Sequence, residues 1–147
     1  MIGVGTLEVS DVAFIADLST EAYFAHGDSV RAVGWLESGH PYTQGDVPAE
    51  FLAALKKHVE TAHVVVLFMG LHDCSLCPAG RRTAGLGNLL VPTSDRLYVA
   101  PELITHYIQD HGYRPPDEFV AAVLACPEQG SATFLELLRP FESTWRG

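Results

Sequence analysis

The chain has 147 residues, of which 48% are hydrophobic. This is enough for one compact domain with its own core, spanning residues 1–147, and too little for two independent domains. The formal net charge of -9 argues against general nucleic-acid binding, because phosphate contacts need clustered Lys and Arg. The acidic balance is compatible with a basic protein partner.

The sequence gives no sign of targeting to a membrane. Residues 1–10 have neither a basic region nor a long apolar core, so we expect no secretory signal. The longest apolar run, residues 64–69, is far shorter than the roughly 20 residues that a membrane-spanning helix needs. We therefore expect a cytoplasmic protein. Its three cysteines exclude a fully paired disulfide framework.

The first half of the chain predicts strand, helix and strand in that order. Residues 29–36 have the alternation of a strand and are followed by a loop rich in Gly, His and Pro. Residues 48–60 form the clearest helix, with Pro48 in its first turn and Asp46 available as a cap. Residues 62–69 are almost wholly apolar and rich in valine, which is typical of a buried strand.

The second half predicts two short strands and three helices. An irregular loop over residues 70–87 precedes the strands, which are expected at residues 88–91 and 96–99. The helices are expected from Pro101 to about Asp110 with Gly112 ending it, from Pro115 to Cys126, and over residues 131–138 with Phe134, Leu135 and Leu138 facing inward. The whole is an α+β fold in which a small, mostly antiparallel sheet packs with three to four helices.

Two cysteines and two histidines have the composition of a zinc site. Cys74 and Cys77 are separated by two residues, so both sulfurs can reach one ion from a single turn. His106 and His111 are spaced within the range seen for paired histidine ligands. We predict that these four residues bind a structural zinc ion. The long interval between the two pairs excludes a zinc finger of the usual length.

Two histidines, His72 and His111, are candidates for the fourth ligand. His72 lies two residues before Cys74 and could bind from the same loop instead of His111. Five residues is a poor match to the helical period, so His111 would be a ligand only if the helix ends before it. Gly112 makes such an end possible.

Two enzymatic interpretations compete with a structural site. A redox pair should lie at a helix N-terminus, whereas the stretch after Cys77 contains two glycines and is a poor helix. A zinc deaminase would use His58 and Glu60 as its His-x-Glu element, but these residues close a helix that the deaminase element should open. Both interpretations are therefore disfavoured.

The remaining candidates have ordinary explanations. Cys126 is expected to be a small buried apolar residue at a helix end. His40 and His58 are expected on the surface.

Several segments resemble a known family. They are His72-x-Cys74-x-x-Cys77, then His106-Tyr107-Ile108, then His111-Gly112-Tyr113-Arg114-Pro115-Pro116 followed by Glu118-Phe119. The resemblance is to a family of small uncharacterised bacterial proteins, and it extends from about Ser29 to Cys126. It implies a small domain and assigns no activity or catalytic residue.

The leading hypothesis is a zinc-stabilised binding or interaction domain without enzymatic activity. A zinc- or thiol-dependent enzyme is the alternative, and it would need an open coordination position beside a pocket. A toxin-neutralising partner is a further alternative, suggested by small size and acidic charge. It predicts binding to a basic protein that salt weakens.

Overall fold

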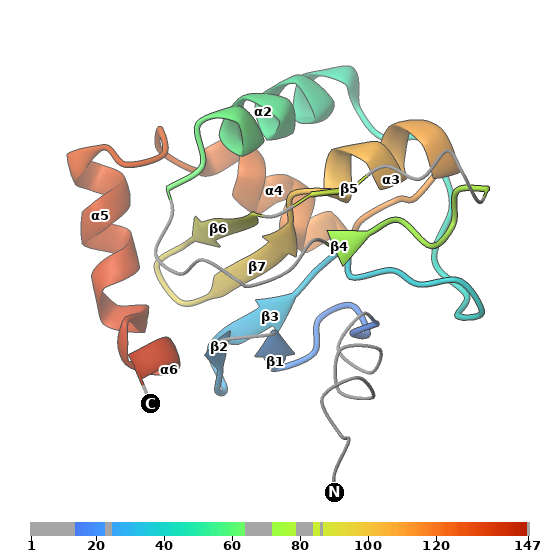
Figure 1. Cartoon of the computed structure of the whole chain (residues 1–147). Coiled ribbons are helices and arrows are strands. Elements are labelled where there is room, and N and C mark those ends of the chain that lie inside the picture. The colour runs from blue at the N-terminus through green and yellow to red at the C-terminus, as the bar shows by residue number, and fades with distance from the viewer. Residues whose placement is uncertain (1–13, 23–24, 64–71, 79–83, 86, 147) are drawn as a thin grey trace, which may run out of the picture.

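The computed structural model describes residues 14–22, 25–63, 72–78, 84–85 and 87–146. At its centre is a three-stranded sheet in the order β3-β7-β6 (Figure 1). Its strands are β3 (Val30–Ala32), β6 (Asn88–Pro92) and β7 (Leu97–Pro101). β6 and β7 pair antiparallel, and β3 joins β7 in parallel.

The turn between β6 and β7 is held by one side chain. Thr93 Oγ1 donates to the carbonyl of Arg96 and accepts the Arg96 N–H at 2.9 Å. This closes the short connection that the antiparallel pair requires.

Both faces of the central sheet are buried, which explains why most residues of its strands are apolar. Side chains alternate between faces along each strand. Leu89 and Val91 contact a cluster that includes Phe51, Ile104 and Phe119 from the helices. On the other face, side chains from all three strands join those of the C-terminal helices, among them Val30, Leu90, Val99, Phe134 and Leu138.

Helices lie against each face (Figure 1). The first face carries α2 (Ala49–Glu60), α3 (Ile104–His111) and α4 (Asp117–Ala125), and the second carries α5 (Ala132–Leu138), the 3-10 turn η1 (Arg139–Phe141) and α6 (Ser143–Arg146). Ser131 caps α5 by accepting the Phe134 N–H on its hydroxyl oxygen.

Two further pairs of very short strands complete the described structure. β1 (Glu21–Ala22) pairs with β2 (Ala25–His26), and β4 (His72–Asp73) pairs with β5 (Ala84–Gly85), both antiparallel. Three of the four strand pairs are thus antiparallel. The predicted α+β class with a mostly antiparallel sheet is confirmed.

A half-buried carboxylate ties the N-terminal segment to this framework. Asp17 accepts the Gly34 N–H at 3.0 Å and the Tyr113 hydroxyl at 2.8 Å. Burial raises the pKa of Asp17, and the two hydrogen bonds oppose that rise. The segment after α3 is therefore linked to the segment before β1.

Several predicted boundaries are wrong. Pro101 ends β7 rather than opening a helix, and α3 begins only at Ile104. The expected loop at residues 70–87 contains the paired strands β4 and β5. Asp46 does not cap α2, because Pro48 occupies the N-cap position and no side chain bonds there. Residues 64–69 of the strand predicted at residues 62–69 lie outside the described residues.

Two side chains are placed differently from expectation. Leu135 was expected inward and is exposed, whereas Phe134 and Leu138 are buried as predicted. His58 was expected on the surface, but its side chain is buried, because it lies on the face of α2 that meets α4. His40 is exposed as expected.

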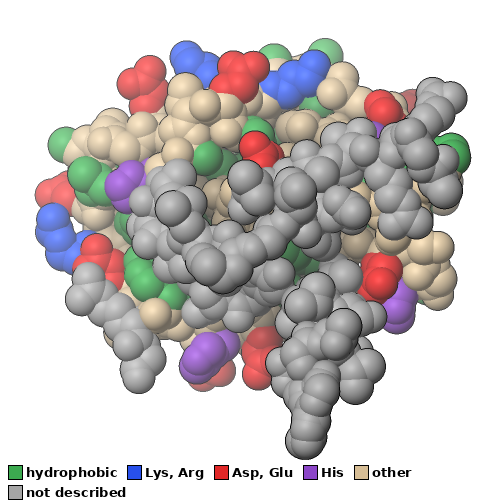
Figure 2. All heavy atoms as spheres, in the orientation of Figure 1, with side chains coloured by type: hydrophobic (Ala, Val, Ile, Leu, Met, Phe, Trp, Pro, Cys, Tyr) green, Lys and Arg blue, Asp and Glu red, His purple; other side chains and the backbone are tan. Residues whose placement is uncertain are grey.

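Within the described ranges, no helix is long and apolar enough to cross a membrane. On the visible face of the molecule, acidic side chains are scattered and form no continuous patch (Figure 2).

Candidate metal centre

Two structural elements bring the four predicted ligands together. Cys74 and Cys77 lie in the tight turn that follows β4, and the Cys77 N–H bonds the Cys74 carbonyl at 3.4 Å. His106 and His111 lie on α3, with His111 as its last residue. The ligand atoms of all four side chains lie within 4.8 Å of one another.

The end of α3 makes this arrangement possible. Gly112 adopts a left-handed conformation with φ of 67°, which ends the helix directly after His111. The expectation that the helix must end before His111 is wrong. His111 is the last residue of α3, so no further helical turn lies beyond it. Its imidazole can therefore lie close to that of His106. The ring centroids are 5.0 Å apart.

Three sulfur–nitrogen distances fit a tetrahedral ion. Cys77 Sγ lies 3.2 Å from His106 Nε2 and 3.5 Å from His111 Nε2, and Cys74 Sγ lies 3.5 Å from His111 Nε2. Zinc bonds of about 2.3 Å to sulfur and about 2.0–2.1 Å to nitrogen place neighbouring ligand atoms roughly 3.6 Å apart in a tetrahedron. One cation at the centre of the four ligand atoms would account for all three contacts at once.

A carboxylate fixes the tautomer of one histidine. Asp110 Oδ2 lies 3.2 Å from His106 Nδ1, one helical turn away on α3. The carboxylate accepts a hydrogen bond from Nδ1–H, which keeps the proton of the neutral imidazole on Nδ1. Nε2 is then unprotonated, and its lone pair points at Cys77. Carboxylate-histidine pairs of this kind orient metal-binding imidazoles. Sequence reasoning missed Asp110, although its spacing of four residues from His106 was visible.

Burial favours the neutral forms of the ligands when no cation is present. It raises the pKa of the Cys74 thiol, and the neighbouring Cys77 raises it further. Burial also lowers the pKa of His106, with His111 adding to the effect and Asp110 opposing it. A neutral imidazole is the form that binds a metal, and a cation would offset the cost of ionising the thiols.

The surroundings hold both halves of the cluster in place. Ser75 Oγ accepts the Ser38 N–H at 2.8 Å, which ties the cysteine turn to the loop after β3. The Tyr42 hydroxyl donates to the His111 carbonyl at 2.9 Å. Buried Tyr107 contributes to the core behind the cluster.

The structure places the other sequence candidates elsewhere. His72 is in β4, and its side chain lies outside what the structure describes, so its role as an alternative ligand stays a prediction. His58 and Glu60 are the residues of the disfavoured deaminase element, and both lie near the end of α2, outside the cluster. Cys126 caps α4, and burial raises the pKa of its thiol to about 11, as suits an inert apolar residue.

A family model described as "Domain of unknown function (DUF7919)" matches residues 13–124. The chain belongs to this family. The matched region contains all four residues of the cluster, and its description assigns no activity. No curated protein and no solved structure matches the chain. The family and the geometry together give a domain of unknown function with a cluster that could hold a metal ion.

Proposed function

We propose that the chain is a zinc-stabilised interaction domain, in which Cys74, Cys77, His106 and His111 bind one structural zinc ion. The observation that carries this proposal is the convergence of the four ligand atoms, which all lie within 4.8 Å of one another and of which three pairs lie 3.2–3.5 Å apart. Two thiolates and two imidazoles are a ligand set that zinc takes in structural sites.

The number of ligands supports a structural role over a catalytic one. Catalytic zinc sites have three protein ligands and keep a position for water, whereas structural sites are closed by four. Cys74 is fully buried, and the other three ligands are partly buried. A zinc ion here would join the cysteine turn to α3, two elements separated by about thirty residues.

The partner is proposed to be a basic protein. The net charge of -9 would favour its approach through long-range attraction. Salt should weaken such an association, because the charges on a protein surface are screened within about 10 Å at 0.1 M ionic strength.

X-ray absorption at the zinc edge tests the structural assignment. We expect two sulfur ligands at about 2.3 Å, two nitrogen ligands at about 2.0–2.1 Å and no oxygen ligand. The Cys126→Ser variant is the matched control and should give the same spectrum, because Cys126 lies outside the cluster. A bound water oxygen with three protein ligands would contradict a closed site and would favour an enzyme.

A further inference from the structure

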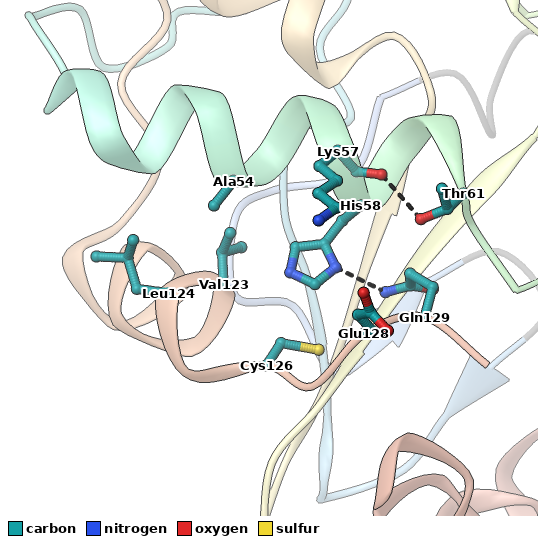
Figure 3. A pocket seen from close by; sticks show the side chains of 9 residues that line it. All are labelled: Ala54, Lys57, His58, Thr61, Val123, Leu124, Cys126, Glu128 and Gln129. Carbon is teal, nitrogen blue, oxygen red and sulfur yellow. Dashed lines mark hydrogen bonds between the residues drawn. The ribbon is translucent and has the colours of Figure 1, made fainter. Parts of the chain in front are cut away.

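A second group of polar side chains lies between α2 and the connection from α4 to α5. It lines a cavity of about 380 Å³ whose walls include His58, Cys126, Glu128 and Gln129 (Figure 3). The imidazole of His58 projects from α2 toward Gln129. None of these residues belongs to the candidate metal centre.

The Gln129 side chain joins three separate parts of the fold. Its Oε1 accepts the His63 N–H at 3.0 Å, just after α2. Its Nε2 donates to the Leu90 carbonyl at 3.2 Å, in the middle of β6, and lies 3.3 Å from His58 Nδ1. The connection between α4 and α5 is thereby fastened to both α2 and the central sheet.

This network requires a neutral His58. The two backbone partners fix the orientation of the amide, because Oε1 faces an N–H and Nε2 faces a carbonyl. The amide nitrogen can only donate, so His58 Nδ1 must accept and cannot carry a proton. The other ring nitrogen then holds the hydrogen that bonds the backbone of Val123. Burial lowers the pKa of His58, in agreement with this arrangement.

Among the residues that the structure describes, few other charged or titratable groups face His58. Lys57, on the same helix, opposes its protonation. From the connection between α4 and α5, Cys126 and Glu128 line the cavity, and Cys126 is neutral because burial raises its pKa to about 11. His63 lies beyond Gln129, and α4 contributes only Val123 and Leu124.

We propose that His58 and Gln129 form a pH-operated latch. A proton taken from solvent by His58 Nδ1 makes that atom a donor facing the Gln129 donor, so their hydrogen bond breaks. The Glu128 carboxylate, on the wall of the same cavity, becomes the acceptor for the new Nδ1–H. Gln129 leaves the His63 N–H and the Leu90 carbonyl, and the connection between α4 and α5 loosens from α2 and β6.

Nuclear magnetic resonance on the full-length, metal-loaded protein tests the latch. His58 should titrate below pH 6.5. The side-chain amide resonances of Gln129 should shift with the same midpoint, and the protection factor of the His63 amide should fall about tenfold, as expected for one lost hydrogen bond. The exposed His26 supplies the control variant, because His26→Gln should leave the response of the Gln129 resonances to pH unchanged.

Two variants separate the latch from other effects of acid. In Gln129→Glu, a carboxylate facing Nδ1 should raise the midpoint of His58. In His58→Gln, which cannot be protonated, the response of Gln129 and of the His63 amide to pH should disappear. Resonances of Gln129 and protection of the His63 amide that stay constant while His58 titrates would overturn the proposal, as would an unchanged response in His58→Gln.

Discussion

Asp110 is the residue whose role can be tested with the least disturbance to the fold, because its side chain is exposed and touches the cluster through His106 alone. Replacing it with alanine should free the His106 ring and lower zinc affinity about 10- to 100-fold. Competition with a chromogenic chelator measures this change. The neighbouring exposed Gln109→Ala should bind zinc as the parent does, and an Asp110→Ala affinity equal to that of this control would refute the role of the carboxylate.

A substitution at Tyr113 tests the role of the half-buried Asp17 carboxylate. Tyr113→Phe removes a hydroxyl that donates to Asp17 and should lower the free energy of unfolding by about 1–3 kcal/mol at neutral pH. The bond lowers the pKa of Asp17, so its removal raises that pKa further. An aspartate whose pKa is higher in the folded state than in the unfolded state lowers the free energy of unfolding as the pH rises. The destabilisation caused by Tyr113→Phe should therefore be larger at pH 7 than near pH 4.

Tyr42→Phe is the matched control for that experiment. It removes a hydroxyl that donates to the backbone carbonyl of His111, which carries no charge. The free energy of unfolding should therefore fall by about 0.5–1.5 kcal/mol, and by a similar amount at both pH values. Urea denaturation at the two pH values measures all three proteins. If both variants lower the free energy of unfolding equally, and by the same amount at both pH values, then Tyr113 does not stabilise the ionised form of Asp17.

At the residue scale, the sequence allowed the cluster of two cysteines and two histidines to be predicted, because thiol and imidazole groups take part in few kinds of chemistry and their spacing is visible in the sequence. The position of His111 could not be predicted, since it depends on where α3 ends, and the role of His72 stays a prediction. The burial of His58 was missed for a related reason. It depends on Gln129, 71 residues away, and local spacing carries no information about such a partner.

At the scale of elements, the position of α3 depends on a close approach to β3. Gly34 follows β3 with φ of 83°, and a Cβ there would lie 2.9 Å from Cδ1 of Ile104, the first residue of α3. Among the glycines that the structure describes, Gly34 is thus the position where an added Cβ would come closest to another residue, and that residue belongs to the helix that carries both histidines.

Gly34→Ala should destabilise the protein by about 2–4 kcal/mol, because the left-handed conformation and the contact with Ile104 both become unfavourable. Gly39→Ala is the matched control, since its φ is 94° and nothing lies within 4 Å of an added Cβ. It should show the conformational cost alone, about 1–2 kcal/mol. Equal thermal unfolding of the two variants would show that the approach of α3 to β3 is not tight.

Helices and the β6-β7 pair were largely predictable, since their periodicity and turn residues are local signals. Pro101 was misread because a proline after an apolar run is as compatible with the end of a strand as with the start of a helix. The β4-β5 pair was missed because two-residue strands have no period to detect.

At the scale of the whole molecule, the proposed zinc ion should contribute to folding. Removal of zinc by a chelator should lower the melting temperature by about 10 °C, since a ligand at 1,000 times its dissociation constant adds about 4 kcal/mol. Addition of zinc should restore the original melting temperature, which differential scanning calorimetry would measure. A protein that melts identically with and without chelator, although zinc has left it, would show that the ion is not structural.

The most direct measurement for the central claim is the zinc content of the purified chain, by elemental analysis, alongside single cysteine variants. We predict about one zinc per chain in the parent and in Cys126→Ser, and much less in Cys74→Ser and Cys77→Ser, because only the last two remove a ligand from the cluster. Absence of zinc from the parent prepared without chelator, or equal zinc in all four proteins, would contradict the account.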